Sequence, residues 1–246
     1  MLSKAQNKYI RSLSQQKYRT EHGVFVVEGD KIAREWLAES HRIQYIVATE
    51  QWLQDNVKLT GKHKDAIIAS VSEQELQAVS QLQKANEVLL VVYRDNDNAT
   101  LPAGEWCIAL DTLQDPGNMG TIIRIADWFG IRHVIATPDS VDFYNPKVIQ
   151  AAMGGHLRVQ LHSADILEFI AQFDVSVYAA ALDGDNIYRL KDVKPGVIII
   201  GNESKGISAT VMQQATKKIT IPRIGGAESL NAAVSAGIIC ALLIKP

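Results

Sequence analysis

The stretch LDTLQDPGNMGTIIRIADWFGI, residues 110–131, decides the fold class of this chain. It follows an apolar run at Trp106–Leu110, typical of a buried strand, and contains a helical pattern over Asn118–Phe129. A tight turn between strand and helix is favoured by three residues, Pro116, Gly117 and Gly120. Asn118 can cap the helix. A strand that leads directly into a helix is the repeating unit of α/β sheets.

The same alternation continues to the end of the chain. Further strands are expected at His133–Ala136, Leu157–Leu161, Val175–Ala180, Val197–Ile200 and Ile219–Ile221. Further helices are expected at Pro146–Met153, Ile166–Phe173 and Leu230–Ile244. The near-continuous β-branched run at 197–200 is typical of a strand with both faces covered. We therefore predict a parallel sheet with helices on both faces over residues 105–246.

Before residue 96 the alternation is weaker. Strands are expected at Val24–Val27, Gln44–Ala48, Ala66–Ala69 and Val88–Tyr93, and helices at Lys31–Glu39 and Glu73–Ser80. Residues 96–104 are polar, contain proline and glycine, and keep no hydrophobic periodicity. The sequence therefore predicts a smaller α/β domain at 1–95, a linker at 96–104 and the larger domain at 105–246.

The composition is that of an ordinary globular protein. Of 246 residues, 47% are hydrophobic and 21% charged, with a net charge of -2, which argues against disorder, collagen and coiled coil. No apolar run approaches the roughly 18 residues that span a membrane.

The two cysteines, Cys107 and Cys240, each lie in an apolar stretch. We interpret them as core residues in a reducing compartment, which predicts a cytoplasmic protein. The histidines show no metal-binding spacing, so no metal is expected, and His156 and His162 are interpreted as structural.

The start of the chain is basic, with no acidic residue before Glu21. Lys4, Lys8 and Arg11 fall at i, i+4 and i+7, so a helix would carry all three on one face. Such a face suits an RNA phosphate backbone. The same residues also fit a solvated surface helix or a transit-like targeting segment. The sequence leaves these three interpretations open.

A second unusual segment is VIIIGNESKGIS, residues 197–208, where a buried strand ends in Gly201-Asn202-Glu203. Parallel sheets bind ligands beyond the carboxyl ends of their strands, so Glu203 lies where a catalytic or binding group is expected. The alternative is a turn with a solvated acid. The G-x4-G spacing is that of a P-loop, but Ile207 replaces the required lysine, and G-x-G-x-x-G is missing. Nucleoside triphosphate and dinucleotide binding are therefore disfavoured.

The third segment is ITIPRIGGAESLNAAVSAGIICALL, residues 219–243. A strand ends at Ile221-Pro222, Gly225-Gly226 gives a flexible loop, and Ser229-Leu230-Asn231 opens a long helix with a surface of small residues. Such a surface lets a ligand loop or a partner helix come close, or it serves ordinary helix packing. In the first segment, Arg124 stands among apolar residues, so its side chain either snorkels or faces a site.

Together and in this order, the three segments resemble the motifs of the SpoU (TrmH) family of RNA ribose methyltransferases, in the SPOUT class. The motifs are N-x-G-x-x-x-R, then G-N-E-x-x-G-I-S, then I-P with S-L-N downstream, and the resemblance spans residues 106–244. GVFVVEGDKIAREWL, residues 23–37, is similar to the opening of the family's substrate-binding domain. One departure is Ala232-Ala233, where the family commonly has Val-Ser; we expect it to affect packing alone.

The resemblance implies a C-terminal α/β fold with a deep trefoil knot and a homodimer that pairs through the knotted domain. It implies S-adenosylmethionine-dependent methylation of a ribose 2′-hydroxyl in RNA, in ribosomal RNA rather than transfer RNA. The polar site residues map onto Asn118, Arg124, Glu203, Ser229 and Asn231. The cofactor pocket would be lined, largely through backbone atoms, by Gly201, Ile221 and Leu230.

Arg124 is the residue that the family assigns to the 2′-hydroxyl. Because a guanidinium stays protonated in proteins, we expect it to orient the hydroxyl and hold the adjacent phosphate rather than act as a base. Two competing hypotheses remain. One is a catalytically silent RNA- or ribosome-binding protein with the same fold, and the other is a nucleotide-using α/β enzyme of another class.

Overall fold

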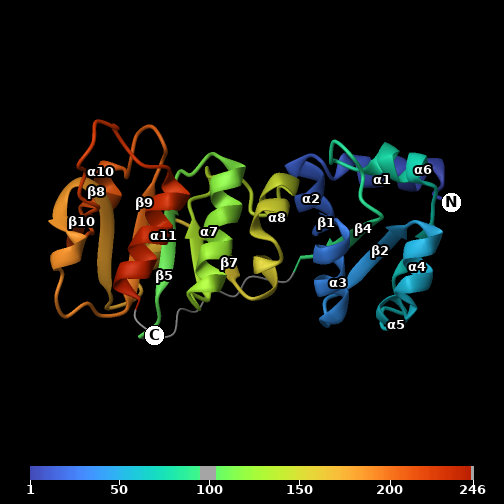
Figure 1. Cartoon of the computed structure of the whole chain (residues 1–246), viewed down its shortest axis with the longest axis horizontal. Helices are drawn as coiled ribbons and strands as arrows, with labels where there is room; N and C mark the ends of the chain where they lie inside the picture. The colour runs from blue at the N-terminus through green and yellow to red at the C-terminus, as the bar shows by residue number, and fades with distance from the viewer. Residues whose placement is uncertain (95–103, 245–246) are drawn as a thin grey trace. The chain divides into compact units, whose positions relative to one another are not determined.

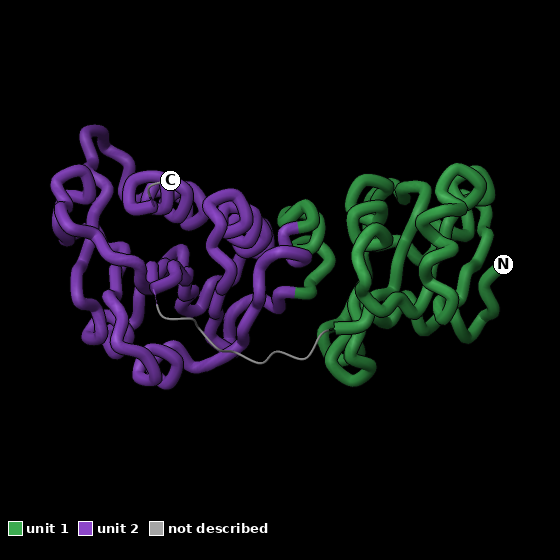
Figure 2. Tube along the Cα trace, turned by 90° about the horizontal axis from the view of Figure 1, so that it is seen from below, with its two compact units in different colours: residues 1–96, 144–154 green, residues 97–143, 155–246 purple. Residues whose placement is uncertain are grey.

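The computed structural model describes residues 1–94 and 104–244 (Figure 1). The chain divides into two compact units, residues 1–96 with 144–154 and residues 97–143 with 155–246 (Figure 2). The predicted linker, 96–104, lies outside the described residues except for Gly104. Within the described ranges, no helix is long and apolar enough to cross a membrane.

The first unit is built on a four-stranded sheet of order β1-β4-β2-β3. Its strands are β1 (Val24–Glu28), β2 (Ile43–Ala48), β3 (Ile67–Ser70) and β4 (Val88–Tyr93), close to the predicted bounds. β4 runs antiparallel to both β1 and β2, whereas β2 and β3 are parallel. The sheet is therefore mixed, which the alternation of strands and helices alone did not indicate.

Seven helices belong to the described part of the first unit. They are α1 (Lys4–Ser12), α2 (Gln16–His22), α3 (Asp30–Ala38), α4 (Glu50–Asp55), α5 (Val57–Thr60), α6 (Glu73–Val79) and α8 (Pro146–Ala152). Ile10 and Leu13 are fully buried in the core cluster that includes Leu76 and Leu89. The N-terminal segment is thus a structural part of this unit.

The helix α8 comes from the C-terminal half of the sequence but packs on β1 of the first unit. The amide Nε2 of Gln150 donates a 2.7 Å hydrogen bond to the backbone oxygen of Glu28. The rings of Tyr144 and Phe25 lie 4.7 Å apart. These contacts explain why residues 144–154 group with the first unit.

The second unit holds a six-stranded sheet of order β10-β8-β9-β5-β6-β7. Every pair of neighbours is parallel, which confirms the predicted parallel sheet. The strands are β5 (Cys107–Asp111), β6 (His133–Ala136), β7 (Gln160–Ser163), β8 (Ser176–Asn186), β9 (Gly196–Gly201) and β10 (Lys217–Thr220).

One strand prediction in this sheet was wrong. Leu157–Leu161 was expected to be a strand, but β7 begins only at Gln160, and Gly155–Leu157 forms the short 3-10 helix η1. Met153 and Gly154 both adopt a positive φ, 49° and 84°, which turns the chain after α8. The extra turn delays entry into the sheet by three residues.

Helices cover both faces of the parallel sheet, as predicted. They are α7 (Pro116–Trp128), α9 (Ile166–Ile170), α10 (Ala209–Met212) and α11 (Ala232–Leu243), with the short helix η2 (Ile187–Arg189). Cys107 and Ala109 of β5 pack in one cluster with residues of α9 and α10. Side chains alternate between faces along a strand, so Ile108 and Leu110 face the opposite side. Figure 1 shows α7 and α11 side by side over that part of the sheet, and the two helices are in contact.

Candidate active site

The helix α7 begins two residues earlier than predicted. The side chain of Asp115 is its N-cap and accepts a 2.7 Å hydrogen bond from the backbone N–H of Asn118, with Pro116 in the first turn. The prediction that Asn118 caps this helix was therefore wrong. Proline lacks an N–H and fits the first helical position, which explains the early start. As a consequence, the side chain of Asn118 is left for other partners.

Two hydrogen bonds join the three sequence motifs at the side chain of Asn118. Its Nδ2 donates to Oε1 of Glu203 at 3.1 Å, and its Oδ1 accepts from Nδ2 of Asn231 at 2.8 Å. Asn231 is held in turn as the N-cap of α11, because its Oδ1 accepts from the N–H groups of Ala233 and Val234. The structure thus brings together three of the five polar residues predicted for the site.

The carboxylate of Glu203 is held by several donors. Besides Asn118, the backbone N–H groups of Gln114 and Asp115 donate to it at 3.4 and 3.1 Å. Burial is the largest single influence and favours the neutral acid, but the hydrogen bonds from Asn118 and the backbone together outweigh it. The pKa of Glu203 therefore lies below its usual value. Glu203 is more than a solvated acid in a turn, because its charge fixes the loop that precedes α7.

The loop after β9 is a tight hairpin in which Asn202 and Gly206 exchange two backbone hydrogen bonds. Asn202 Oδ1 accepts from the N–H groups of Ser204 and Lys205, and its Nδ2 donates to the Thr112 oxygen at 2.8 Å. A Cβ atom on Gly201 would lie 2.2 Å from the backbone carbon of Gly206. Only glycine fits at position 201, because the hairpin folds back over it.

Sequence reasoning missed the residues that anchor this hairpin. Asp111, buried at the end of β5, accepts from the Ser208 N–H at 2.7 Å. Thr112 follows it with a φ of 58°, an uncommon conformation for a residue with a Cβ. A sequence signal for Asp111 was present. Like Asn202, it is a polar residue close after an apolar run predicted as a buried strand, where ligand-binding groups are expected.

Two predicted residues lie apart from this network. Arg124 is exposed on α7, about a third of a turn round the helix from Asn118 and ~9 Å further along its axis. The side chain of Arg124 makes no hydrogen bond or ion pair with another described residue, so its guanidinium is available to a ligand. Ser229 is exposed in the segment before α11.

The three residues predicted to line a cofactor pocket lie in loops beyond the sheet. Gly201 ends β9, Ile221 follows β10, and Leu230 directly precedes the N-cap of α11 and is about half exposed. Between them, residues 222–230 make no backbone–backbone hydrogen bond within the part of the chain that the structure describes. Apart from the Ala227 oxygen, which accepts a 3.2 Å hydrogen bond from Nη1 of Arg223, their N–H and C=O groups are therefore available to a ligand.

His133 and His162 are buried, and His156 is half-buried. His156 Nε2 bonds the Phe143 oxygen at 2.9 Å, and His162 Nε2 lies 3.2 Å from Nδ1 of His133. Burial lowers the pKa of His162 and, with a neighbouring imidazole, that of His133. Among the described residues no group of three or more potential metal ligands is found.

The chain is an α/β protein with a polar cluster and ligand-accessible loops beyond the carboxyl ends of a parallel sheet. A family model described as the SpoU rRNA Methylase family matches residues 105–241, and one described as an MRM3-like substrate binding domain matches residues 4–90. The chain belongs to the SpoU rRNA methylase family, which confirms the family predicted from the sequence and makes it an RNA methyltransferase.

Several relatives and solved structures match almost the whole chain. The 23S rRNA (guanosine(2553)-2'-O)-methyltransferase RlmP of Bacillus subtilis is 26% identical, over 93% of this chain and 92% of its own length. A TrmH-family protein from Porphyromonas gingivalis is 35% identical, with a TM-score of 0.87, covering 99% of this chain and 98% of its own. An AdoMet-bound rRNA methyltransferase from Sinorhizobium meliloti is 27% identical, with a TM-score of 0.88, covering 99% and 96%.

Proposed function

We propose that this chain transfers the methyl group of S-adenosylmethionine to a ribose 2′-hydroxyl of ribosomal RNA. The observation that carries the proposal is the pair of hydrogen bonds through which Asn118 joins Glu203 and Asn231. They tie together one residue from each of the three family motifs. The assignment to ribosomal RNA is supported by RlmP, which is named for methylation of 23S rRNA and matches along nearly its full length.

The residues at the carboxyl edge of the sheet fit S-adenosylmethionine. An adenine nucleoside needs an apolar slot and a few main-chain hydrogen bonds, and it needs no cation. Ile221 and Leu230 supply half-buried and exposed apolar side chains, and residues 222–230 supply backbone groups that, except for the Ala227 oxygen, have no partner among the described residues. Gly201 lets the hairpin approach closely. When bound, the cofactor supplies a methyl group on a sulfonium, which is already reactive, so the protein contributes mainly positioning.

Each polar residue then has a role that its geometry supports. Arg124, exposed and unpaired among the described residues, would orient the 2′-hydroxyl and hold the adjacent phosphate. Glu203 and Asn231 would fix the ribose or the methionine end of the cofactor. Asn118 couples these two residues, and Ser229 completes the set from the segment before α11. The hydroxyl proton would pass to water as the methyl group is accepted.

A homodimer that pairs through the second unit belongs to the same proposal. Trp128 of α7 is 84% exposed and Val234 of α11 is 51% exposed, although the two helices pack together. Large apolar side chains exposed on adjacent elements are typical of an interface. The small residues of α11 serve in part for ordinary helix packing, because Gly237 lies against Ile125 of α7.

The deep trefoil knot is also a proposal, and the strand order supports it. After β9 the chain passes to β10 at the far side of β8, and α11 then returns to contact β9 and α7.

We place the protein in the cytoplasm, where a reducing environment keeps buried Cys107 and Cys240 as free thiols. We also propose that the first domain, predicted at residues 1–95, binds RNA, and that the second domain, predicted at 105–246, carries out the methyl transfer.

The experiment that tests the function is ribose-methylation mapping of total RNA from cells with and without this gene. In cells without the gene, we expect one 2′-O-methyl group to be lost from ribosomal RNA. The wild-type gene should restore this methyl group, and the Arg124→Ala variant should not. An unchanged map, together with purified protein that binds RNA but not S-adenosylmethionine, would instead establish the silent scaffold.

A further inference from the structure

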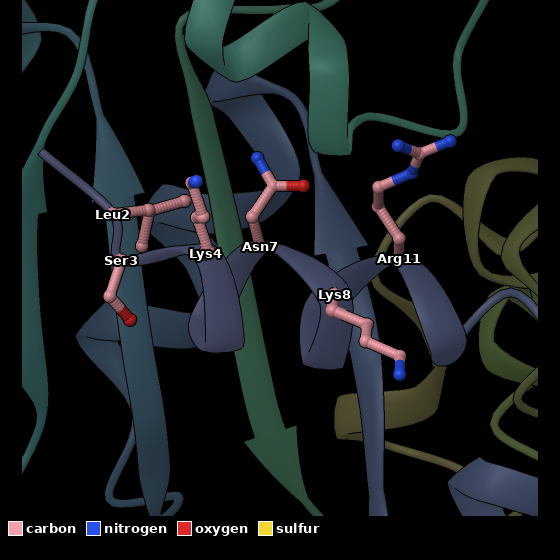
Figure 3. A pocket seen from close by; sticks show the side chains of 6 residues that line it. All are labelled: Leu2, Ser3, Lys4, Asn7, Lys8 and Arg11. Atoms are coloured by element: carbon pink, nitrogen blue, oxygen red, sulfur yellow. The ribbon is translucent and has the colours of Figure 1, made fainter.

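A concentrated group of positive charges lies on the exposed face of α1, in the first unit. Lys4, Lys8 and Arg11 are exposed there, and with Leu2, Ser3 and Asn7 they line a hollow of about 390 Å³. In Figure 3 the side chains of Lys4, Asn7 and Arg11 point to one side of the helix and that of Lys8 to the other. The cations therefore border a shared surface from two sides. We call this surface the α1 basic face.

The helix that carries the α1 basic face is fixed at its first turn. Ser3 and Gln6 form a capping box, in which the Gln6 N–H donates to Ser3 Oγ at 3.2 Å and the Ser3 N–H donates to Gln6 Oε1 at 2.8 Å. The opposite side of the helix is anchored in the core by Ile10. A partner thus meets cations on an ordered helix, which lowers the entropic cost of binding.

The far end of the helix is fixed by a buried arginine. Arg19 of α2 is 2% exposed, and its Nη1 donates to the backbone oxygens of Leu13 and Ser14 at 2.8 Å each. This charge satisfies carbonyl groups just past the end of α1. Arg19 is therefore part of the support of the helix and not part of its binding face.

We propose that the α1 basic face binds the phosphodiester backbone of the RNA substrate, an inference that rests on the proposed function. Lys4 and Arg11 are ~10 Å apart along the helix axis, so their side chains can reach more than one phosphate. The helix α1 itself carries no acidic residue. The helix α6, which contacts α1, carries Glu73 and Glu75 in its first turn, and Glu75 interacts with the charge of the Met1 amino group. The half-buried amide of Asn7 adds a donor between them. Phosphate contacts carry affinity without sequence information, so this face holds the RNA and leaves the choice of nucleotide to other residues.

The structure favours RNA over a lipid surface as the anionic partner. A helix that lies on a membrane inserts an apolar face opposite its basic face. In α1 that side is already used, because Ile10 is fully buried and Tyr9 packs against the same core cluster. What remains for a partner is polar and positively charged.

The test compares two full-length triple variants that each remove three positive charges from the first unit. One is Lys4→Gln, Lys8→Gln and Arg11→Gln together; the control is Lys58→Gln, Lys62→Gln and Lys64→Gln, all exposed positions outside the α1 basic face. Glutamine matches lysine and arginine in helix propensity. Binding to a fluorescently labelled fragment of ribosomal RNA is followed by anisotropy over a series of salt concentrations.

We expect the α1 variant to bind at least ~10-fold more weakly near 0.1 M salt, and its slope of log affinity against log salt to fall by about 2. The control should stay within about threefold of the wild type, and both variants should bind S-adenosylmethionine normally in calorimetry. If the triple variant unfolds, Lys8→Gln and Arg11→Gln singly should each lower the slope by about 0.8.

Equal losses in the two triple variants, or none in either, would overturn the inference. Unchanged RNA binding together with lost binding of an acidic protein would also overturn it and identify the face as a protein contact. Failure of the wild type to bind S-adenosylmethionine or to transfer a methyl group counts against the proposed function instead, because RNA binding by α1 is measured separately.

Discussion

The side-chain amide of Asn118 donates a 3.1 Å hydrogen bond to the carboxylate of Glu203, across 85 residues of sequence. The same amide group accepts from Asn231, 113 residues away. Neither contact stabilises a helix or a strand by itself. They hold the start of α7, the hairpin after β9 and the start of α11 in one arrangement, so the geometry of the site depends on polar contacts rather than on the apolar core.

Replacing Glu203 by glutamine tests this arrangement. The variant keeps the size of the side chain but loses the charge. Its NH2 group replaces one carboxylate oxygen, either Oε2, which accepts from the Gln114 N–H, or Oε1, which accepts from Asp115 and Asn118. We expect the rate of methyl transfer, measured with labelled S-adenosylmethionine, to fall at least ~10-fold. Glu168→Gln, an exposed position on α9, is the matched control and should keep the full rate. A Glu203→Gln rate within twofold of wild type would contradict the role of the carboxylate.

Arg124→Ala should abolish methyl transfer without disturbing the fold. The side chain is exposed and makes no hydrogen bond or ion pair with another described residue, so the free energy of unfolding should change by no more than about 0.5 kcal/mol. Arg189→Ala, which removes another exposed arginine of the same unit, should remain active. Initial rates and urea unfolding of both variants give the comparison. An active Arg124→Ala enzyme would remove this residue from the site.

Gly201→Ala should damage both stability and cofactor binding. The added methyl group would lie 2.2 Å from the backbone carbon of Gly206 and 2.3 Å from the nitrogen of Ile207, so the hairpin must shift. Overpacking of this kind costs about 1–3 kcal/mol. Urea unfolding and calorimetry with S-adenosylmethionine measure the two effects. Gly226→Ala, where nothing lies within 4 Å of the new atom, should leave the stability unchanged; equal effects at both positions would refute the steric argument.

Trp128→Ala should weaken the proposed homodimer. Buried aromatic anchors at interfaces are commonly worth 2 kcal/mol or more, so the dissociation constant should rise by ~30-fold or more. Sedimentation velocity over a range of protein concentrations measures it. Tyr188→Ala removes another exposed aromatic side chain, 65% accessible, from the same unit and should have no effect. A wild-type chain that stays monomeric at high concentration would contradict the proposed homodimer.

The stability of the protein should decrease at acidic pH, and His156 should account for part of the decrease. Burial lowers the pKa of His156 to about 4, although the Phe143 oxygen and the charge of Asp142 act in the opposite direction. An unfolded histidine titrates near pH 6.5. Below that pH the unfolded chain takes up a proton that the folded chain excludes, so the free energy of unfolding falls from about pH 7 down to pH 4.

A shift of this size corresponds to at most ~3 kcal/mol. Urea unfolding at pH 7 and pH 5 should show a smaller difference for His156→Gln than for the wild type. A residual difference is expected in the variant, because the pKa values of His133 and His162 are also lowered. Identical pH dependence in variant and wild type would show that His156 does not titrate in this range.

The sequence predicted the central strands β5, β6 and β9 well because they are buried, largely apolar runs. The outer strands β7 (QLHS) and β10 (KKIT) are more polar, and their bounds were predicted less well. It misplaced the start of α7 because two candidate caps, Asp115 and Asn118, stand three residues apart. It also left α2, α4, α5 and α10 unpredicted, since each of these helices buries a single residue and shows no apolar periodicity. The equally short α6, α8 and α9 bury two or three residues each and were predicted. Strand direction was equally hidden, because the antiparallel pairing of β4 arises from contacts between distant residues.

The candidate site was predictable as a set of residues and not as a set of contacts. Asn118, Glu203 and Asn231 were found through motif resemblance, while their hydrogen bonds depend on how three loops meet. Asp111 was missed although it directly follows a predicted buried strand, and Thr112 was missed because its backbone oxygen, which accepts from Asn202, belongs to no spacing pattern. The exposure of Trp128 was also not predicted, because an apolar residue within an apolar helix is normally expected in the core.

The placement of α8 with the first unit has a practical consequence for dissecting this protein. The chain enters the second unit, leaves it at residue 144 and re-enters it at 155, so no single cut separates the two units. A fragment ending near residue 94 would leave the β1 surface uncovered, and one beginning near 104 would carry α8 without its binding surface. Each fragment would expose apolar groups that the intact chain hides. If either fragment fails to stay in solution, the cause would therefore be the lost contact between α8 and β1 and not an intrinsic instability of that half.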